Sequence, residues 1–169
     1  PEIVYPPGYT ISYSNHGFAI LGHVIETTSK LSFNEYIRKN ILEPLEMVNS
    51  NFDNLIPAGT TCPKGYYHIL NTEKEAYQDF AQTPPASSLI TSAEDFSHFL
   101  IMLINEGKFH NKQILKPETV KEMFVPRYKF NPVLPGYACA WEENYIAGKR
   151  IFQHSGLTWG FSSLCILIP

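Results

Sequence analysis

Residues 150–169 have the sequence RIFQHSGLTWGFSSLCILIP. This stretch contains two short runs that are rich in aromatic and β-branched residues, and Gly156–Gly160 between them has the composition of a turn. A similar run lies upstream, beyond the polar segment Asn144–Gly148. The sequence therefore predicts an antiparallel meander whose strands are Gly136–Glu143, Arg150–His154 and Phe161–Pro169.

Helix signals dominate the chain before this meander. Tyr13-Ser14 precedes a stretch with apolar residues at helical spacing, Ser32 and Glu35 form a capping-box pattern, and Pro117 suits the first turn of a helix. The predicted helices are residues 15–29, residues 32–42, a segment from Ser92 to a stop at Gly107, and one that opens at Pro117. Helices followed by a run of strands predict an α+β domain, with helices packed on an antiparallel sheet.

The composition is that of one folded globular core. The 169 residues are 44% hydrophobic and 17% charged, which excludes a disordered chain and leaves little room for two domains. The formal net charge is -3 and no run of Lys or Arg is longer than a pair, so nucleic acid is not expected as a partner. No apolar run is long enough to predict a membrane-spanning segment in this chain.

The segment Asn49–Pro85 has no sustained periodicity and is rich in Asn, Thr, Gly, Pro and Tyr. It predicts a long excursion with at most a short strand near Tyr66–Ile69. Because long irregular segments in compact domains often border binding sites, we expect this excursion to lie beside a functional cleft.

Cysteine and histidine patterns indicate no metal or other cofactor. No cysteine lies in a C-x-x-C spacing, and we interpret Cys62, Cys139 and Cys165 as buried thiols, the last two within strands. No H-x-H or H-E-x-x-H pattern occurs, and Asp95 and His98 are interpreted as a solvated pair one turn apart on a helix.

The sequence PGYTISYSN, residues 7–15, places a phenol, a hydroxyl and a carboxamide immediately before a predicted helix N-terminus. The amides and the positive dipole end of a helix favour a phenolate or an oxyanion there, which makes Tyr13 a candidate general base. The alternative is structural: Ser14 or Asn15 caps the helix and Tyr13 packs against its surroundings. This segment alone leaves both interpretations open.

A second candidate patch, HSGLTWG, spans His154–Gly160 at the end of a predicted strand. Gly156 would let a ligand approach the backbone, the edge amides would bond a substrate, and His154 offers an imidazole for proton transfer. An ordinary hairpin turn explains the same residues equally well.

Taken together and in this order, the motifs resemble the serine β-lactamase and penicillin-binding protein family, in its class C β-lactamase-like, esterase-type branch. A Y-x-N element opens a helix, an I-x-x-P-L-x-M element follows, a small-residue turn leads into another helix, and an H-x-G strand comes last. These elements are Tyr13–Asn15, Ile41–Met47, Thr91–Asp95 and His154–Gly156. The resemblance covers nearly the whole chain, and its specificity comes from the ordered set.

The resemblance implies a serine hydrolase. In that family a Ser on an S-x-x-K helix attacks an acyl carbonyl, a Lys and the Y-x-N Tyr transfer the proton, and backbone amides hold the oxyanion. Carried over by position, Tyr13 is the proton shuttle and His154 the second catalytic candidate. The implied substrate-binding residues are Asn15, Ser155, Gly156 and Leu157, the last through its backbone amide. Where relatives have Lys, His154 would bind a substrate carboxylate only when protonated.

One element of the family pattern is absent from the sequence. No S-x-x-K occurs, and the nearest match, Thr27–Lys30, has Thr at the nucleophile position and lies at the end of a predicted helix. The family order places the nucleophile before the Y-x-N element, and a last strand and helix after Pro169. We therefore interpret residues 1–169 as a partial β-lactamase-related domain, partnered by the missing part of the same domain, with exposed apolar surface along Phe161–Pro169.

The resulting hypothesis is acyl-enzyme hydrolysis of an ester, a β-lactam or a D-amino-acid amide, with the nucleophile outside this chain. The substrate would be a small molecule or a peptidoglycan-like acyl compound, no cofactor is implied, and the resemblance suggests an extracytoplasmic or cell-envelope location. Two alternatives stay open. One is a non-catalytic binding or scaffold protein that retains the fold, and the other is a fragment that works only with its missing half.

Overall fold

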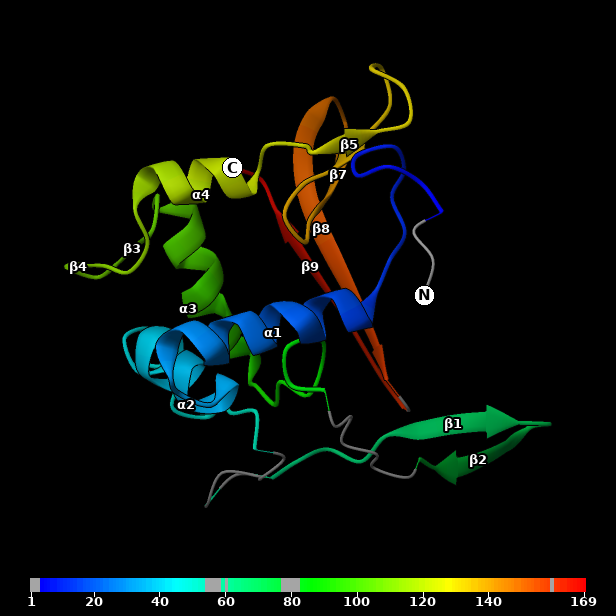
Figure 1. Cartoon of the computed structure of the whole chain (residues 1–169). Helices are drawn as coiled ribbons and strands as arrows, with labels where there is room; N and C mark the ends of the chain where they lie inside the picture. Colours follow the sequence, from blue (N-terminus) through cyan, green and yellow to red (C-terminus); the bar gives the residue numbers. More distant parts are fainter. Residues whose placement is uncertain (1–3, 54–58, 60, 77–82, 159) are drawn as a thin grey trace.

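A five-stranded antiparallel sheet with helices packed against it forms the centre of the molecule (Figure 1). The computed structural model describes residues 4–53, 59, 61–76, 83–158 and 160–169. The strand order β5–β6–β7–β8–β9 follows the chain order, so the predicted meander and the α+β class are confirmed. The strands are β5 Tyr128–Lys129, β6 Gly136–Tyr137, β7 Glu142–Ile146, β8 Lys149–Thr158 and β9 Phe161–Leu167.

The strand bounds differ from the predicted ones at several places. Strand β7 continues to Ile146, into the polar segment that is expected to separate two strands. Strand β8 continues through Gly156 to Thr158, and Thr158 pairs with Phe161 of β9. The predicted strand Gly136–Glu143 is divided by a turn in which the Ala138 N–H donates to the Trp141 carbonyl at 2.8 Å. Cys139 lies in this turn and is exposed, so its predicted place in a buried strand is wrong. Cys62 and Cys165 are half-buried.

The helices begin where their caps predict. The Ser14 hydroxyl accepts the Gly17 N–H at 3.0 Å, and the Ser32 hydroxyl accepts the Glu35 N–H at 3.3 Å. The Glu35 carboxylate pairs with Lys39 at 2.8 Å, so the second half of the predicted capping box is not formed. The helices are α1 Asn15–Ser29, α2 Phe33–Ile37, the π-helical turn η1 Arg38–Leu42, α3 Ala93–Ile104 and α4 Pro117–Met123. Gly107, with φ of +87°, follows α3 as the predicted stop.

The core lies between the sheet and helices α3 and α4. Phe152 and Leu167, opposite one another in the β8–β9 ladder, are 0% and 2% exposed. They pack in one cluster with Met102 of α3, Val120 of α4 and Leu45, which belongs to the P-L-x-M element. Each such side chain contributes about 1.5–3 kcal/mol when it leaves water, so this cluster fixes the position of β8.

Asp95 is a buried hydrogen-bond acceptor and does not form a solvated pair with His98. It is 2% exposed and accepts hydrogen bonds from the Asn49 N–H at 2.7 Å and the Ser50 hydroxyl at 2.8 Å. Burial acts to raise the pKa of Asp95, but the hydrogen bonds from Ser50 and Asn49 outweigh it and hold this pKa below its ordinary value. His98 contacts the Leu45 carbonyl through Nδ1 at 2.8 Å. The interpretation of Asp95 and His98 as a solvated pair is therefore wrong, because both tie α3 to the segment after η1.

A two-stranded arm, β1 Tyr66–Ile69 and β2 Thr72–Glu75, projects from the molecule (Figure 1). Its base contacts the turn between β8 and β9: a Cβ added to Gly160 would lie 2.7 Å from the Gly65 Cα. The predicted strand at Tyr66–Ile69 is confirmed. The rest of the predicted excursion includes residues 54–58, 60 and 77–82, which lie outside the described residues.

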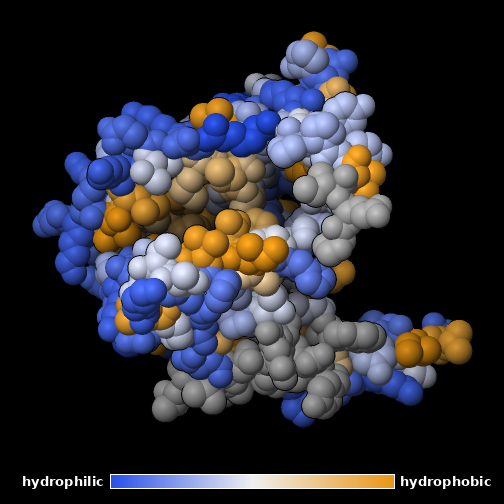
Figure 2. Space-filling model, viewed as in Figure 1, coloured by the Kyte–Doolittle hydropathy of each residue, from blue (hydrophilic) through white to orange (hydrophobic). Residues whose placement is uncertain are grey.

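Apolar side chains remain exposed on two elements. Ile20, Leu21 and Val24 of α1 are at least half-exposed, and Figure 2 shows an apolar band over α1 at the border of a hollow. In the last segment Leu164, Ile166 and Ile168 are 62%, 42% and 59% exposed, as expected for Phe161–Pro169. Within the described residues, no helix is long and apolar enough to cross a membrane.

Candidate active site

Tyr13 stands immediately before the first turn of α1 and points its phenol into solvent. Its side chain is 72% exposed, and Ser14, not Asn15, caps the helix. Asn15 is the first residue of α1 and is also exposed. The structural alternative is therefore met only in part. Ser14 caps the helix, but the Tyr13 side chain is exposed rather than packed. The phenol is therefore available to a reaction partner beside the positive end of α1.

His154, Ser155, Gly156 and Leu157 follow one another along β8. In an antiparallel ladder the N–H and C=O groups of successive residues point to alternate neighbouring strands. Thr158 closes a two-residue turn with Phe161, so Thr158, Gly156 and His154 direct these groups toward β9. Ser155 and Leu157 direct their N–H and C=O groups away from β9, to the side of β8 on which β7 lies.

The β7 side of β8 is unpaired at residues 154–158. Strand β7 pairs with β8 only from Lys149 to Gln153, whereas β9 pairs with it from Phe152 to Thr158. Within the part of the chain that the structure describes, no strand covers the β7 side of residues 154–158. The backbone groups of Ser155 and Leu157 are thus available at an exposed edge, where an extended or carbonyl-bearing ligand can hydrogen-bond.

The side chains alternate between the two faces of the sheet. His154 shares the helix-covered face with Phe152 and lies opposite Cys165, whose thiol donates to the His154 carbonyl at 3.4 Å. Burial raises the pKa of the Cys165 thiol. The Leu157 side chain is on the opposite face and is 85% exposed. His154 is half-buried.

Gly156 has a structural role that sequence reasoning missed. A Cβ on Gly156 would lie 2.6 Å from the Ser163 hydroxyl oxygen, directly across the ladder. The glycine therefore preserves the close pairing of β8 and β9, in addition to any role in ligand approach. The sequence signal was the glycine itself, but its partner across the strand becomes known only from the register.

The two predicted patches lie on different elements of the fold. Tyr13 and Asn15 stand at the start of α1, and residues 154–157 lie on β8. Among the described hydrogen bonds and ion pairs, none connects the Tyr13 side chain to His154.

Glu143 is a further residue that sequence reasoning missed. This carboxylate is 3% exposed and binds Arg150 Nε at 2.6 Å, Lys129 Nζ at 2.7 Å and the Gly136 N–H at 3.0 Å. Burial acts to raise the pKa of Glu143, but Lys129 and Arg150 outweigh it and leave this pKa below its ordinary value. The cluster ties β5, β6, β7 and β8 together at the end of β8 that precedes His154. Its only sequence signal is a carboxylate at an inward position of a strand.

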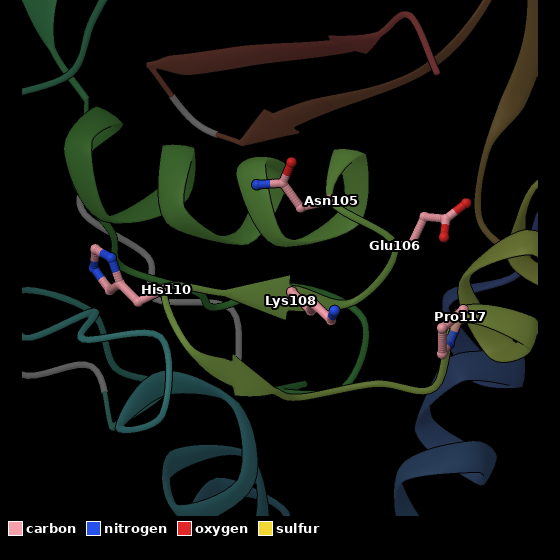
Figure 3. Close-up of a pocket in the computed structure, with 5 residues that line it drawn as sticks. All are labelled: Asn105, Glu106, Lys108, His110 and Pro117. Atoms are coloured by element: carbon pink, nitrogen blue, oxygen red, sulfur yellow. The ribbon is translucent and has the colours of Figure 1, made fainter.

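A recess of about 420 Å³ lies elsewhere, between the end of α3 and the hairpin of β3 (Lys108–Phe109) and β4 (Lys112–Gln113) (Figure 3). Its lining residues are Asn105, Glu106, Lys108, His110 and Pro117, and none of the predicted site residues belongs to it. Glu106 pairs with Lys121 at 3.1 Å, and His110 lies 3.9 Å from Glu46. Because Glu106 and His110 face partners in the fold, we assign no ligand to this recess. Within the described residues, no group of His, Cys, Asp and Glu could hold a metal ion.

Comparison with known proteins places this geometry in a family. The family model described as Beta-lactamase matches residues 1–169. "Protein flp" of Staphylococcus aureus (strain MW2) is 25% identical over 175 residues, covering 99% of this chain and 33% of that protein. The chain thus spans about a third of the length of such curated relatives.

Solved structures share the fold. The octameric penicillin-binding protein homologue from Pyrococcus abyssi superposes with a TM-score of 0.84 at 27% identity, over 98% of this chain and 37% of that one. A D-stereospecific amidohydrolase from Streptomyces sp. superposes with a TM-score of 0.76 at 20% identity, over 97% and 48% of the two chains. At that identity the second likeness concerns the fold alone.

Proposed function

The chain belongs to the Beta-lactamase family, and we propose that the protein containing it is a serine hydrolase that forms and hydrolyses an acyl-enzyme. The proposed substrate is an ester, a β-lactam or a D-amino-acid amide. The nucleophilic Ser and its Lys would be supplied by sequence outside residues 1–169, because S-x-x-K is absent from these residues. The exposed apolar surfaces of α1 and of Phe161–Pro169 would then be covered by the remainder of the protein.

The open edge of β8 carries this proposal. A tetrahedral intermediate needs hydrogen-bond donors that are fixed before the reaction begins. The Leu157 N–H points away from β9, beyond the end of β7, on a strand held by a buried core and by the Glu143 cluster. It therefore suits the role of one oxyanion donor, while Ser155 offers backbone groups that align an extended substrate on the same edge.

Tyr13 would move the proton. When the Ser hydroxyl attacks the carbonyl carbon, its proton passes through the Lys and the Tyr13 phenol to the leaving alcohol or amine as the acyl bond breaks. Water then attacks the Ser ester, which releases the carboxylic acid and restores the hydroxyl. The exposed phenol beside the α1 N-terminus has the access that both transfers require. Asn15 would hold a substrate amide or the Lys.

His154 bears on substrate choice. An imidazole binds a substrate carboxylate by charge only when it is protonated, in contrast to a Lys at the same position. Ser155–Thr158 contains no ionisable side chain. We therefore favour uncharged esters and amides over carboxylated antibiotics.

The experiment uses the full-length protein. We expect an S-x-x-K sequence upstream of Pro1, turnover of a p-nitrophenyl ester or labelling by a fluorescent penicillin, and slower acylation in Tyr13→Phe. Tyr145→Phe is the matched control, because Tyr145 is an exposed tyrosine on β7 with no proposed role. A full-length sequence without S-x-x-K would instead support the alternative, a non-catalytic binding or scaffold protein. Equal acylation rates in Tyr13→Phe and wild type would remove Tyr13 from the reaction.

A further inference from the structure

Tyr5 and Tyr9 form a stacked aromatic pair on the surface. Their ring centroids are 5.3 Å apart and the ring planes differ by 13°. The rings are nevertheless solvent-accessible, since Tyr5 is 54% and Tyr9 66% exposed. An exposed aromatic pair leaves outer ring faces free for a ligand.

The turn between the two tyrosines sets their geometry. The Tyr9 N–H donates to the Pro6 carbonyl at 3.1 Å, and Gly8 has φ of +81°. Pro7 followed by Gly8 is the residue pair that a type II turn requires, because proline fixes φ at the first central position and glycine accepts positive φ at the second. The turn therefore brings the two tyrosines to the same side of the segment, where their rings stack on one another.

The pair lies on the segment that leads to Tyr13. Figure 1 shows this segment running into the first turn of α1. Tyr9 precedes Tyr13 by one short stretch without helix or strand, so their Cα atoms are at most about 14 Å apart. A ring attached a few bonds from a reacting carbonyl can span part of that distance.

The lack of charged side chains in the segment that carries the two rings indicates what kind of group would bind. Val4–Asn15, the segment that bears both rings, contains no Asp, Glu, Lys or Arg. A cation over an exposed tyrosine face gains only about 0.5–1 kcal/mol without a carboxylate partner, and an anion needs a basic partner. A neutral planar ring needs neither, and it packs on a phenol in the offset-stacked arrangement.

We propose that the Tyr5–Tyr9 pair is an aromatic platform that stacks on a neutral aromatic ring near the acyl group of the substrate, with Tyr9 as a specificity-determining residue. This proposal rests on the proposed hydrolase function. It assigns the platform to substrate selection and gives it no part in proton transfer.

The test compares three methyl esters that share one leaving group: those of acetic, cyclohexylacetic and phenylacetic acid. The full-length protein is assayed by titration of the acid released, and kcat/KM is measured for each ester. In Tyr9→Leu, the ratio of kcat/KM for phenylacetate to that for acetate should fall about three- to tenfold, mainly through KM. Tyr9→Phe keeps the ring and should keep the ratio, and Tyr145→Leu is the control on an exposed tyrosine outside the platform.

The cyclohexyl ester separates ring stacking from simple apolar contact. The platform is supported if the cyclohexylacetate ratio falls less than the phenylacetate ratio, and it is overturned if both fall equally or neither falls. If no ester is hydrolysed by the wild type, the ester part of the proposed function fails, independently of the platform. Saturation-transfer NMR with phenylacetamide then decides the platform: signal lost in Tyr9→Leu supports it, and equal signal in both proteins overturns it.

Discussion

Pro85 occupies the space beside Gly22 on helix α1. A Cβ placed on Gly22 would lie 2.1 Å from the Pro85 Cγ, which is far inside van der Waals contact. Gly22 is also the buried residue of α1. Helix α1, which follows Tyr13 and begins at Asn15, is thus positioned by the close approach of its backbone to the segment that precedes α3.

Gly22→Ala should therefore destabilise the protein although alanine is the better helix former. The overpacking cost of about 1–3 kcal/mol exceeds the gain in helix propensity of about 1 kcal/mol. Gly17→Ala is the matched control on the same helix, because its Cβ would meet Ser14 at an ordinary 3.6 Å. Urea unfolding of both variants checks the prediction. Similar free energies of unfolding for the two would mean that Pro85 moves aside without cost.

Glu143→Gln should lower the free energy of unfolding by about 2 kcal/mol, since it leaves two cations with a weaker acceptor. The full cost of an unpaired buried charge is not expected, because the side chains of Arg150 and Lys129 are 44% and 30% exposed and retain water. Glu142→Gln, on the exposed neighbouring position, should change stability by less than about 0.5 kcal/mol. Equal losses in the two variants would argue against the Glu143 cluster as a support of β8.

The same carboxylate should make stability depend on pH in acid. The pKa of Glu143 is lower in the folded protein than its ordinary value of 4.5. The contribution of Glu143 to the free energy of unfolding is therefore complete above its ordinary pKa. It is lost as the pH falls below that value and through the lower pKa of the folded state. Unfolding measured from pH 7 down to pH 3 should show the gap between wild type and Glu143→Gln closing in acid. A gap that stays constant would contradict this linkage.

Gly160→Ala should detach the β1–β2 arm from the turn after β8. Its Cβ would lie 2.7 Å from the Gly65 Cα and 2.8 Å from the Ala76 Cβ, and φ is +75°. Gly148→Ala shares that φ but meets nothing within 4 Å, so it reports the backbone strain alone, about 1–2 kcal/mol. The excess cost of Gly160→Ala, together with faster proteolysis within residues 66–75, measures the contact. Identical behaviour of the two alanine variants would show that the arm is not held at Gly65.

Local signals in the sequence were sufficient for the helices and for the order of the strands. The bounds of α1 were predictable because Ser14 caps it from the adjacent position, and a cap is a local interaction. The partners of Asp95 were not predictable, because Asn49 and Ser50 lie 46 and 45 residues away in the chain. The local sequence therefore predicts a solvated Asp95, although the fold buries this carboxylate.

The candidate site, like the fold, was predictable from the sequence only in part. The motifs identified Tyr13 and His154–Leu157, but the open edge of β8 depends on where β7 stops pairing, and that is a property of the register. The composition of Gly156–Gly160 predicts a turn that begins at Gly156, whereas the structure places Gly156 inside β8, where the close approach of Ser163 requires a glycine.

Gly156→Ala separates the two roles of that glycine when it is combined with Ser163→Ala. The single variant brings its Cβ within 2.6 Å of the Ser163 hydroxyl oxygen, but the Ser163 Cβ is at an ordinary 4.0 Å. Removing the hydroxyl should therefore restore most of the stability lost in Gly156→Ala, by about 1 kcal/mol or more. If the glycine also admits substrate to the β8 edge, ester hydrolysis by the full-length double variant should stay low although the fold has recovered. Recovery of both stability and kcat/KM would restrict Gly156 to strand pairing, because a methyl group at that position would then obstruct nothing but the hydroxyl across the ladder.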